Sequence, residues 1–539
     1  MSSGTGMSSV DALVEVTDLT VAFGSLRAVD GLSFTLEKGA ALGLVGESGS
    51  GKSTVASALL GLHRGTGADV GGSVRVAGID VQEASDTDLH RLRGGKAAMV
   101  FQDPLSSLDP YYAIGDQIAE VYRVHTRVSR RAARARAVEV LDRVGIPDAV
   151  RRSRSRPHEF SGGMRQRALI AMALACEPDL LIADEPTTAL DVTVQAQILD
   201  LLHTLREETG LGLLLVTHDV GVAAESVDEI LVMRHGRAVE HGPVDTVLGA
   251  PTEPYTRDLL GAVPRVDAPR APSEAPSAAQ EVVLEATGLR REFGRGKRAF
   301  AAVDDVSLTV HRGETLGIVG ESGSGKTTLG RMLVGLLKPT AGEIKPGGGV
   351  RPDVQMVFQD PVSSLNPRRS VGESIADPLR ARGERDEGRI RERVRELLER
   401  VGLEGAHYDR YPHEFSGGQR QRVGIARALA ADPRVIVCDE PVSALDVTTQ
   451  AQVVALLGEL QRELGLALVF VAHDLAVVRQ VSDRVAVMRR GRIVEQGPAD
   501  EVYDAPQDPY TKQLLAAVPA LDPQVAARRR AARRELATT

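Results

Sequence analysis

Short apolar runs of strand length alternate with longer stretches of mixed polarity along the whole chain. Continuous apolar strands that alternate with helical segments predict mostly parallel sheets covered by helices on both faces. The sequence therefore predicts an α/β protein. The clearest predicted strands are Ala41–Val45, Leu180–Ala183, Leu213–Thr217, Thr315–Val319, Val435–Cys438 and Leu468–Ala472.

The same order of elements occurs twice. Ser161, Asp184, His218 and Tyr255 each recur 255 residues later, as Ser416, Asp439, His473 and Tyr510. Arg-rich segments that predict helices also recur, at 130–144 and 387–401. Duplication of one domain explains such a register, whereas convergence of scattered motifs does not.

The repeat divides the chain into four parts. Residues 12–264 and 281–520 are the two predicted domains, and residues 265–280 are a Pro/Ala-rich segment without a hydrophobic period, which predicts a solvated linker. Residues 521–539 are a basic C-terminal tail, in which Arg528–Arg534 predicts a solvated, frayed helix; contact with anionic lipid is the alternative.

A Gly-rich loop follows the first apolar strand of each domain. It reads GESGSGKS at 46–53 and GESGSGKT at 320–327, and it opens a predicted helix that runs to Leu60 or Leu337. In such a loop the glycines let backbone N–H groups converge on phosphate oxygens, the lysine reaches the β- and γ-phosphates, and the last hydroxyl ligates Mg²⁺. The chain is therefore expected to bind two nucleoside triphosphates.

An acidic pair follows a buried strand in each domain, Asp184-Glu185 and Asp439-Glu440. The carboxyl ends of parallel strands are where α/β sheets bind ligands, and buried carboxylates require a cation or hydrogen-bond donors. We expect each aspartate to bind Mg²⁺ and each glutamate to orient and deprotonate a water.

Two further motifs suggest contacts with phosphate. His218 and His473 each end an apolar strand, where an imidazole can donate a hydrogen bond to a γ-phosphate oxygen and position the attacking water. Ser-Gly-Gly at 161–163 and 416–418 precedes an Ala/Leu-rich helix, and a hydroxyl with exposed N–H groups at a helix N-terminus binds anions.

These motifs, in this order and in both halves, resemble those of the ATP-binding subunits of ABC transporters. The resemblance implies two tandem P-loop ATPase domains, each with a mostly parallel sheet core, an antiparallel β subdomain and a helical subdomain. It also identifies Asp191 and Asp446, each in Ala-Leu-Asp, as the family's D-loops.

The resemblance implies a set of site residues. The catalytic residues would be Glu185, His218, Glu440 and His473. The metal ligands would be Ser53, Gln102, Asp184, Thr327, Gln359 and Asp439. The residues that bind ATP would be Phe23, Gly46, Glu47, Ser48, Gly49, Ser50, Gly51, Lys52, Ser53, Thr54, Gln102, Ser161, Gly162, Gly163, Phe293, Gly320, Glu321, Ser322, Gly323, Ser324, Gly325, Lys326, Thr327, Thr328, Gln359, Ser416, Gly417, Gly418 and Gln419.

The adenine-stacking aromatic is clear in one copy only. Phe23 precedes Lys52 by 29 residues, which matches the family. Phe293 is its counterpart if Arg295–Arg298 is a four-residue insertion, and Phe300 is the alternative.

ABC ATPases hold each ATP between the phosphate loop of one domain and the Ser-Gly-Gly helix of the other. This pairs Lys52 with Ser416 and Lys326 with Ser161. Met164 departs from the usual glutamine that Gln419 keeps, so the two sites are expected to differ in rate while both hydrolyse ATP.

A Pro-Tyr-Thr segment at 254–256 and 509–511 resembles the tail of the oligopeptide/dipeptide importer ATPases, which also serve nickel and glutathione uptake. The resemblance implies ATP and Mg²⁺ as ligands, two membrane permeases as partners and, through them, an extracytoplasmic solute-binding protein. The protein would lie at the cytoplasmic face of the membrane. Some relatives carry an iron–sulfur cysteine cluster in this tail, but Cys176 and Cys438 are the only cysteines, so no cluster is expected.

Composition narrows the alternatives. A net charge of −8 and 3% aromatic residues argue against a nucleic-acid-binding protein. No apolar run approaches the ~20 residues of a membrane-spanning helix, and the first residues lack an apolar signal core. A soluble tandem ABC ATPase that acts on ribosomes or DNA is the alternative from another class, although such proteins tend to have a long charged inter-domain arm or zinc-finger cysteines.

Overall fold

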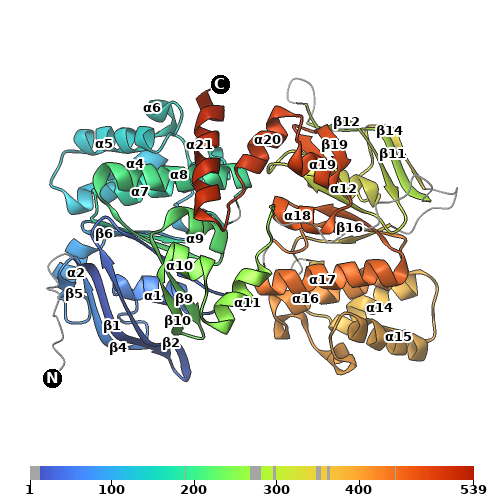
Figure 1. Ribbon diagram of the computed structural model, residues 1–539, viewed down its shortest axis with the longest axis horizontal. Coiled ribbons are helices and arrows are strands. Elements are labelled where there is room, and N and C mark those ends of the chain that lie inside the picture. The colour runs from blue at the N-terminus through green and yellow to red at the C-terminus, as the bar shows by residue number, and fades with distance from the viewer. Residues whose placement is uncertain are drawn as a thin grey trace. The chain divides into compact units, whose positions relative to one another are not determined.

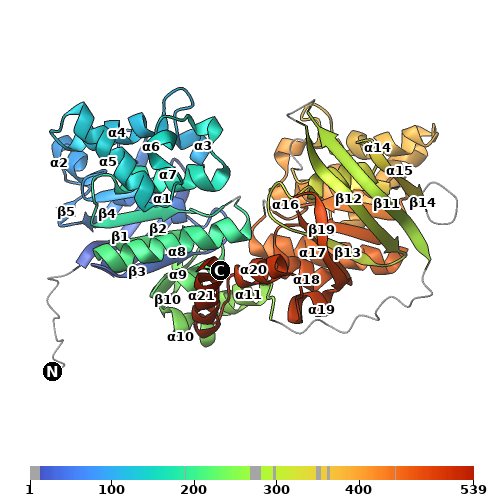
Figure 2. The same ribbon diagram turned by 90° about the horizontal axis from the view of Figure 1, so that it is seen from above.

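The computed structural model describes residues 12–188, 190–267, 281–294, 299–346, 354–360, 364–443 and 445–538 (Figures 1 and 2). The chain forms two compact units. Unit 1 comprises Met1–Leu190, Val194–Val263 and Pro519–Thr539, and unit 2 comprises Asp191–Thr193 and Pro264–Val518. Apart from the short segment Asp191–Thr193, the chain passes from unit 1 to unit 2 after Val263 and returns after Val518, at the same Val-Pro pair of each repeat. Most of the predicted linker, residues 268–280, lies outside the described residues.

The described strands of unit 1 form two sheets. A four-stranded antiparallel sheet has the order β2-β1-β4-β5, and a six-stranded sheet has the order β10-β9-β3-β8-β7-β6, in which only β10 runs antiparallel to its neighbour. The strands are β1 (Ala12–Phe23), β2 (Leu26–Glu37), β3 (Ala41–Val45), β4 (Ala68–Val76), β5 (Ile79–Asp80), β6 (Ala97–Val100), β7 (Leu180–Asp184), β8 (Gly212–Thr217), β9 (Glu229–Arg234) and β10 (Arg237–Pro243).

Helices pack on the six-stranded sheet of unit 1. Those between residues 114 and 174 also pack on one another and form its helical part. The described helices of unit 1 are α1 (Lys52–Leu59), α2 (Asp86–Leu92), α3 (Pro104–Ser107), α4 (Ile114–His125), α5 (Arg130–Arg143), α6 (Ala149–Arg152), α7 (Gly162–Leu174), α8 (Val192–Thr209), α9 (Val220–Ser226), α10 (Val244–Gly249), α11 (Pro254–Ala262) and α21 (Pro523–Thr538).

Unit 2 repeats this architecture. Its described strands form a sheet of order β12-β11-β14 and a sheet of order β15-β16-β17-β13-β18-β19, again with only the last strand antiparallel. The strands are β11 (Val282–Phe293), β12 (Phe300–His311), β13 (Thr315–Val319), β14 (Ala341–Pro346), β15 (Val354–Val357), β16 (Val435–Asp439), β17 (Ala467–Val471), β18 (Arg484–Arg489) and β19 (Arg492–Pro498). The helices are α12 (Lys326–Leu333), α14 (Val371–Ala381), α15 (Glu387–Arg400), α16 (Gly417–Leu429), α17 (Val447–Leu464), α18 (Leu475–Val481), α19 (Ala499–Asp504) and α20 (Pro509–Ala516).

Each central strand is buried because its two faces enter two different cores. In β3, Leu42 and Leu44 pack with α1 and the antiparallel sheet, whereas Ala41 and Val45 pack with the helical part. Successive strand residues point to opposite faces, so a strand covered on both sides must be apolar throughout. The apolar runs of the sequence therefore predicted the strands well, and the α/β fold class is confirmed.

The helix after each phosphate loop is shorter than the sequence predicted. The helix α1 ends at Leu59, one residue before the expected Leu60, and α12 ends at Leu333, four residues before Leu337. Gly61 and Gly335 follow with φ of 63° and 78°, and a residue in this left-handed conformation ends a helix.

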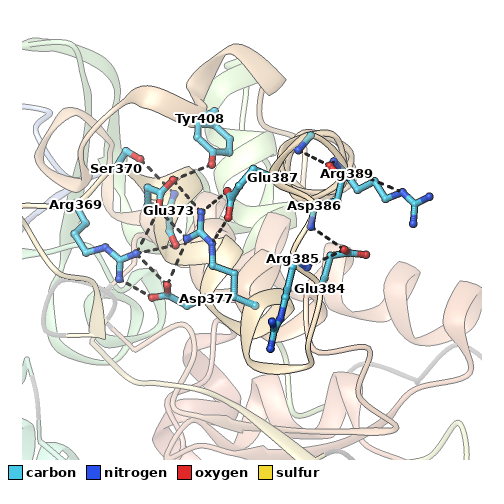
Figure 3. Close-up of polar contacts among 12 residues, drawn as sticks. Arg369, Ser370, Glu373, Asp377, Glu384, Arg385, Asp386, Glu387, Arg389 and Tyr408 are labelled. Carbon is cyan, nitrogen blue, oxygen red and sulfur yellow. Dashed lines mark hydrogen bonds and ion pairs between the residues drawn. The ribbon is translucent and has the colours of Figure 1, made fainter.

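An ion-pair network links α14 to α15 in the helical part of unit 2, which comprises residues 371–429 (Figure 3). Arg380 on α14 pairs with Glu373 at 2.8 Å and with Glu387 of α15 at 2.7 Å. Tyr408 donates a hydrogen bond to Glu373 at 3.1 Å, and Arg369 pairs with Asp377 at 2.7 Å. The bond from Arg380 holds the pKa of Glu373 below its usual range. Arg380 thus joins α14 to the first residue of α15, while its side chain and that of Arg369 stay 31% and 38% exposed.

The basic C-terminal tail forms a helix that packs on unit 1. The helix α21 lies against α9 (Figure 1), and Arg533 pairs with Asp200 of α8 at 3.0 Å and with Glu225 of α9 at 3.5 Å. The Glu225 side chain is 2% exposed, and Arg530 donates a hydrogen bond to its carbonyl oxygen. The expectation of a solvated tail is therefore wrong, because Glu225 offers a buried carboxylate that the arginines neutralise.

We predict that Arg533→Ala releases α21 from unit 1. The substitution leaves the buried Glu225 carboxylate without its ion-pair partner, at a cost of about 3 kcal/mol. Trypsin should then cut after Arg529 and Arg530 about 100-fold faster, as followed by mass spectrometry of the released peptides. Arg528→Ala is the matched control, since Arg528 is exposed. Equal cleavage of the two variants would contradict the docking described here.

Candidate functional site

The two Gly-rich loops lie at the carboxyl end of the first central strand of each unit. Gly51 and Gly325, the glycines before each lysine, have φ of 100° and 107°. A Cβ at these positions would lie 2.4 Å from the carbonyl oxygen of Ala28 and 2.2 Å from that of Ala302. Only glycine fits this conformation and this close approach, so the loop sequence dictates its curled shape.

Each loop lysine is buried beneath its loop. Lys52 Nζ donates hydrogen bonds to the carbonyl oxygens of Gly46 at 2.8 Å and Glu47 at 2.9 Å. Lys326 does the same to Gly320 at 2.6 Å and Glu321 at 3.0 Å. Burial lowers the pKa of Lys326. An ammonium held at this point is placed to meet an anion that enters the loop.

The last hydroxyl of each loop contacts the first carboxylate of each acidic pair. Ser53 donates a hydrogen bond to Asp184 at 3.0 Å, and Thr327 donates one to Asp439 at 3.0 Å. Burial raises the pKa of both aspartates. A hydroxyl and a desolvated carboxylate side by side form an oxygen ligand set that suits a hard divalent cation.

The second carboxylate of unit 1 is held by two predicted site residues. Gln102 donates a hydrogen bond to Glu185 at 2.7 Å, and His218 Nδ1 lies 3.1 Å from the other carboxylate oxygen. Glu185 has φ of 47°, and its N–H donates to the carbonyl oxygen of Val216 at 2.8 Å. A non-glycine residue in this conformation is strained, as is common at functional sites.

Unit 2 repeats this arrangement. Gln359 donates to Glu440 at 2.8 Å, and His473 Nδ1 lies 3.3 Å from the same carboxylate. Glu440 has φ of 46°, and its N–H donates to Val471 at 2.8 Å.

The glutamates and histidines influence each other's protonation. Burial is the largest single effect and would raise the pKa of Glu185 and Glu440. The hydrogen bond and charge of the neighbouring histidine, together with the charge of the loop lysine, outweigh it and lower both values. The bond to Glu185 raises the pKa of His218; in unit 2 burial opposes the corresponding rise in the pKa of His473. Each glutamate is therefore an ionised proton acceptor near neutral pH.

The Ser-Gly-Gly motifs start helices as expected, with one difference between the copies. Ser161 caps α7 by accepting the N–H of Met164, and Ser416 caps α16 by accepting that of Gln419, both at 3.3 Å. Gln419 also accepts the N–H of Ser416 at 2.9 Å, which completes a capping box that Met164 cannot form.

The two candidate adenine-stacking residues occupy equivalent positions. Phe23 is the last residue of β1 and pairs with Leu26, and Phe293 is the last residue of β11 and pairs with Phe300. The second hairpin is longer by four residues, which agrees with the proposed insertion, although Arg295–Arg298 lie outside the described residues. The stacking role of Phe23 and Phe293 stays a prediction.

Glu185 has a further partner that the sequence motifs did not predict. Thr188 donates a hydrogen bond to Glu185 at 2.9 Å. Its counterpart Ser443 donates instead to the backbone carbonyl of Glu440 at 3.2 Å. The sequence does offer a signal for these contacts, because a Thr or Ser lies three positions after each glutamate.

Comparison with protein families gives two matches in each half of the chain. The model described as ABC transporter matches residues 29–188 and 303–443. The model described as the C-terminal region of oligopeptide/dipeptide transporters matches residues 239–288 and 494–538, which include both Pro-Tyr-Thr segments.

Curated relatives match nearly the whole chain. It is 46% identical over 561 aligned residues to the glutathione import ATP-binding protein GsiA of Salmonella choleraesuis (strain SC-B67), covering 95% of this chain and 90% of that protein. The GsiA protein of Escherichia coli O157:H7 matches with the same identity and coverage. Among solved structures, the dimeric bacterial ABC transporter cassette MJ0796 is 29% identical with a TM-score of 0.39, over 43% of this chain and 98% of that one.

We predict that replacing both second carboxylates, by Glu185→Gln with Glu440→Gln, abolishes ATP hydrolysis while leaving ATP binding intact. An amide keeps the hydrogen-bonding shape but cannot accept a proton, so phosphate release should fall by about 100-fold or more. Release of inorganic phosphate and retention of radiolabelled ATP measure the two effects. Glu139→Gln on α5, whose side chain is 66% exposed, is the control. Undiminished hydrolysis in the double variant would refute the assignment of the base.

Proposed function

This chain belongs to the ABC transporter family, as an ATPase subunit whose hydrolysis of ATP energises solute import through membrane permeases, and we propose that the solute is glutathione or a short peptide. The 46% identity to GsiA favours glutathione, and the oligopeptide/dipeptide C-terminal region favours the wider peptide class. Nickel uptake is the remaining alternative within the family.

We propose that each phosphate loop binds the triphosphate of one ATP. The curled backbone at Gly51 and Gly325 exposes N–H groups, and Lys52 and Lys326 supply the positive charge that phosphate oxygens require. Phe23 and Phe293 are the proposed stacking partners of adenine, since they end the equivalent strands β1 and β11 of the two repeats.

Mg²⁺ fits the oxygen ligands beside each loop. Ser53 with Asp184, and Thr327 with Asp439, would hold it, since burial of each carboxylate calls for a positive partner. When bound, the cation supplies neutralisation of charge on the phosphate oxygens.

Glu185 and Glu440 are the proposed general bases. Each would accept a proton from the water that attacks the γ-phosphate, and the bond between phosphorus and the bridging oxygen of ADP would break. His218 and His473 hold these carboxylates in place, and Gln102 and Gln359 bind the same groups from the adjacent strand end. The recurrence of this arrangement in both units is the single observation that carries the proposal.

We further propose that each ATP is completed by the Ser-Gly-Gly helix of the other domain, Ser416 for Lys52 and Ser161 for Lys326. The capping box that Gln419 forms and Met164 does not supports unequal rates at the two sites. The serine hydroxyl and helix N-terminus would contact the γ-phosphate.

The proposed setting is the cytoplasmic face of the membrane, where the chain would bind two permeases and, through them, an extracytoplasmic binding protein. Among the described residues, no helix has the length and apolar character needed to cross a bilayer. ATP-driven closure of the two domains would be transmitted to the permeases as a two-state motion.

We predict that cells lacking this chain fail to accumulate labelled glutathione or a labelled dipeptide from the medium. The wild-type gene should restore uptake, and the Glu185→Gln, Glu440→Gln variant should not, because binding without hydrolysis cannot complete a transport cycle. The two labelled solutes, together with labelled nickel, separate the three candidates. Unaltered uptake of all three would contradict the proposed import role, and co-purification with ribosomes rather than permeases would favour the soluble alternative.

A further inference from the structure

The Pro-Tyr-Thr segments have no role in the sites described above, yet in unit 2 this segment reaches the phosphate loop. It opens α20, where Asp508 caps the helix by accepting the N–H of Tyr510 at 2.7 Å. Tyr510 is only 2% exposed, and its neighbour Thr511 is 1% exposed. An aromatic side chain and a hydroxyl are thus both buried at the start of a helix near the chain end.

A carboxylate on the sheet anchors this segment. Glu495 on β19 accepts the N–H groups of Gln507 at 2.8 Å and Asp508 at 3.1 Å. Although burial alone would raise the pKa of Glu495, the hydrogen bonds that it accepts lower it. The start of α20 is therefore fixed to the edge of the central sheet by several charge-assisted hydrogen bonds.

Tyr510 connects this anchor to the loop. Its hydroxyl oxygen accepts the N–H of Glu321, the second residue of the loop, at 3.1 Å. The carbonyl oxygen of the same Glu321 accepts a hydrogen bond from Lys326 Nζ at 3.0 Å. The guanidinium of Arg489, at the end of β18, lies 4.6 Å from the centre of the tyrosine ring. One loop residue is thus held by Tyr510 through its N–H and by the lysine through its carbonyl.

We propose that Tyr510 is a positioning residue for nucleotide binding, whose hydroxyl fixes the backbone of Glu321 and so preorganises the phosphate loop and Lys326 before nucleotide enters. The inference rests on the proposed role of the loop and goes beyond it by assigning a purpose to the Pro-Tyr-Thr segment. A loop already in its binding conformation pays less ordering entropy when its ligand binds.

Two further observations agree with this role. The loop backbone also lies close to β18, because a Cβ at Gly320 would lie 2.2 Å from the carbonyl oxygen of Met488, the residue before Arg489. Burial raises the pKa of Tyr510 to about 12, so the hydroxyl is neutral at physiological pH and does not repel phosphate.

The first copy contains the same set of residues. Arg234 lies 4.6 Å from the ring centre of Tyr255, which is 8% exposed. Glu240 accepts N–H groups of Thr252 and Glu253 at 2.8 and 3.3 Å, as Glu495 does in unit 2. The arginine beside the tyrosine ring and the glutamate that anchors the helix start are therefore features of the repeat, and the hydrogen bond from the loop to the tyrosine hydroxyl is described for unit 2.

The test is Tyr510→Phe in the full-length chain, with Tyr408→Phe as the matched control. Tyr408 is also buried, also lies 4.6 Å beneath an arginine and also forms a 3.1 Å hydrogen bond, but it contacts Glu373 in the helical part (Figure 3). Both variants lose one hydroxyl and should lower the melting temperature. Only Tyr510→Phe should weaken MgADP binding, by about fivefold at one of two sites, as expected from one lost hydrogen bond. Calorimetric titration measures this effect.

Steady-state kinetics distinguish a role of Tyr510 in positioning the loop from a role in folding stability alone. Because the contact exists before nucleotide binds, its loss should raise KM for MgATP about fivefold while kcat changes less than twofold. Nucleotide affinity of Tyr510→Phe within twofold of that of Tyr408→Phe would overturn the inference. Lys326→Ala with undiminished affinity for MgADP would instead overturn the proposed role of the loop itself.

Discussion

The carboxyl edge of the six-stranded sheet is the constraint on which the whole site depends. In unit 1 the strands β3, β8 and β7 are neighbours and end at this edge, and they deliver the phosphate loop, His218 and the acidic pair. Neighbouring strands lie about 4.8 Å apart, so residues more than a hundred positions apart in sequence meet within hydrogen-bond distance. Gln102 follows β6 at the same edge and completes the group around Glu185. The parallel sheet thus brings charged and polar residues from distant parts of the sequence together at one edge.

The second residue of each acidic pair has a strained backbone, which its neighbours at this edge of the sheet must stabilise. Glu185 and Glu440 both adopt a left-handed backbone conformation, which costs of the order of 1–3 kcal/mol for a residue with a side chain. The N–H bonds to Val216 and Val471 hold these residues against the next strand, and the glutamine and histidine contacts fix their side chains. The same strain occurs in both copies. It is consistent with a glutamate whose carboxylate must point in one direction to accept a proton, even at a cost in folding stability.

The sequence predicted what is local or repeated, and it missed what depends on distant packing. Buried strands, both phosphate loops and the order of the site residues follow from apolar runs and short motifs. The early end of α12 depends on the left-handed conformation of Gly335, which the apolar pattern obscures because Leu336 and Leu337 follow it. Docking of α21 depends on Glu225, which lies about 300 positions earlier in the chain, so no local pattern could reveal it. The contact of Tyr510 with the loop was hidden for the same reason.

The two copies agree in the site and differ at its margins, where Met164 replaces the capping glutamine and Ser443 replaces Thr188. We expect such differences to alter the rates without removing the groups proposed to bind phosphate, so both halves should take up nucleotide. The most direct measurement is the number of MgADP molecules bound per chain at saturation, by equilibrium dialysis of the wild-type protein. Two molecules of MgADP per chain are expected. One per chain would contradict the claim that each half carries a complete phosphate-binding loop, and none would contradict the account as a whole.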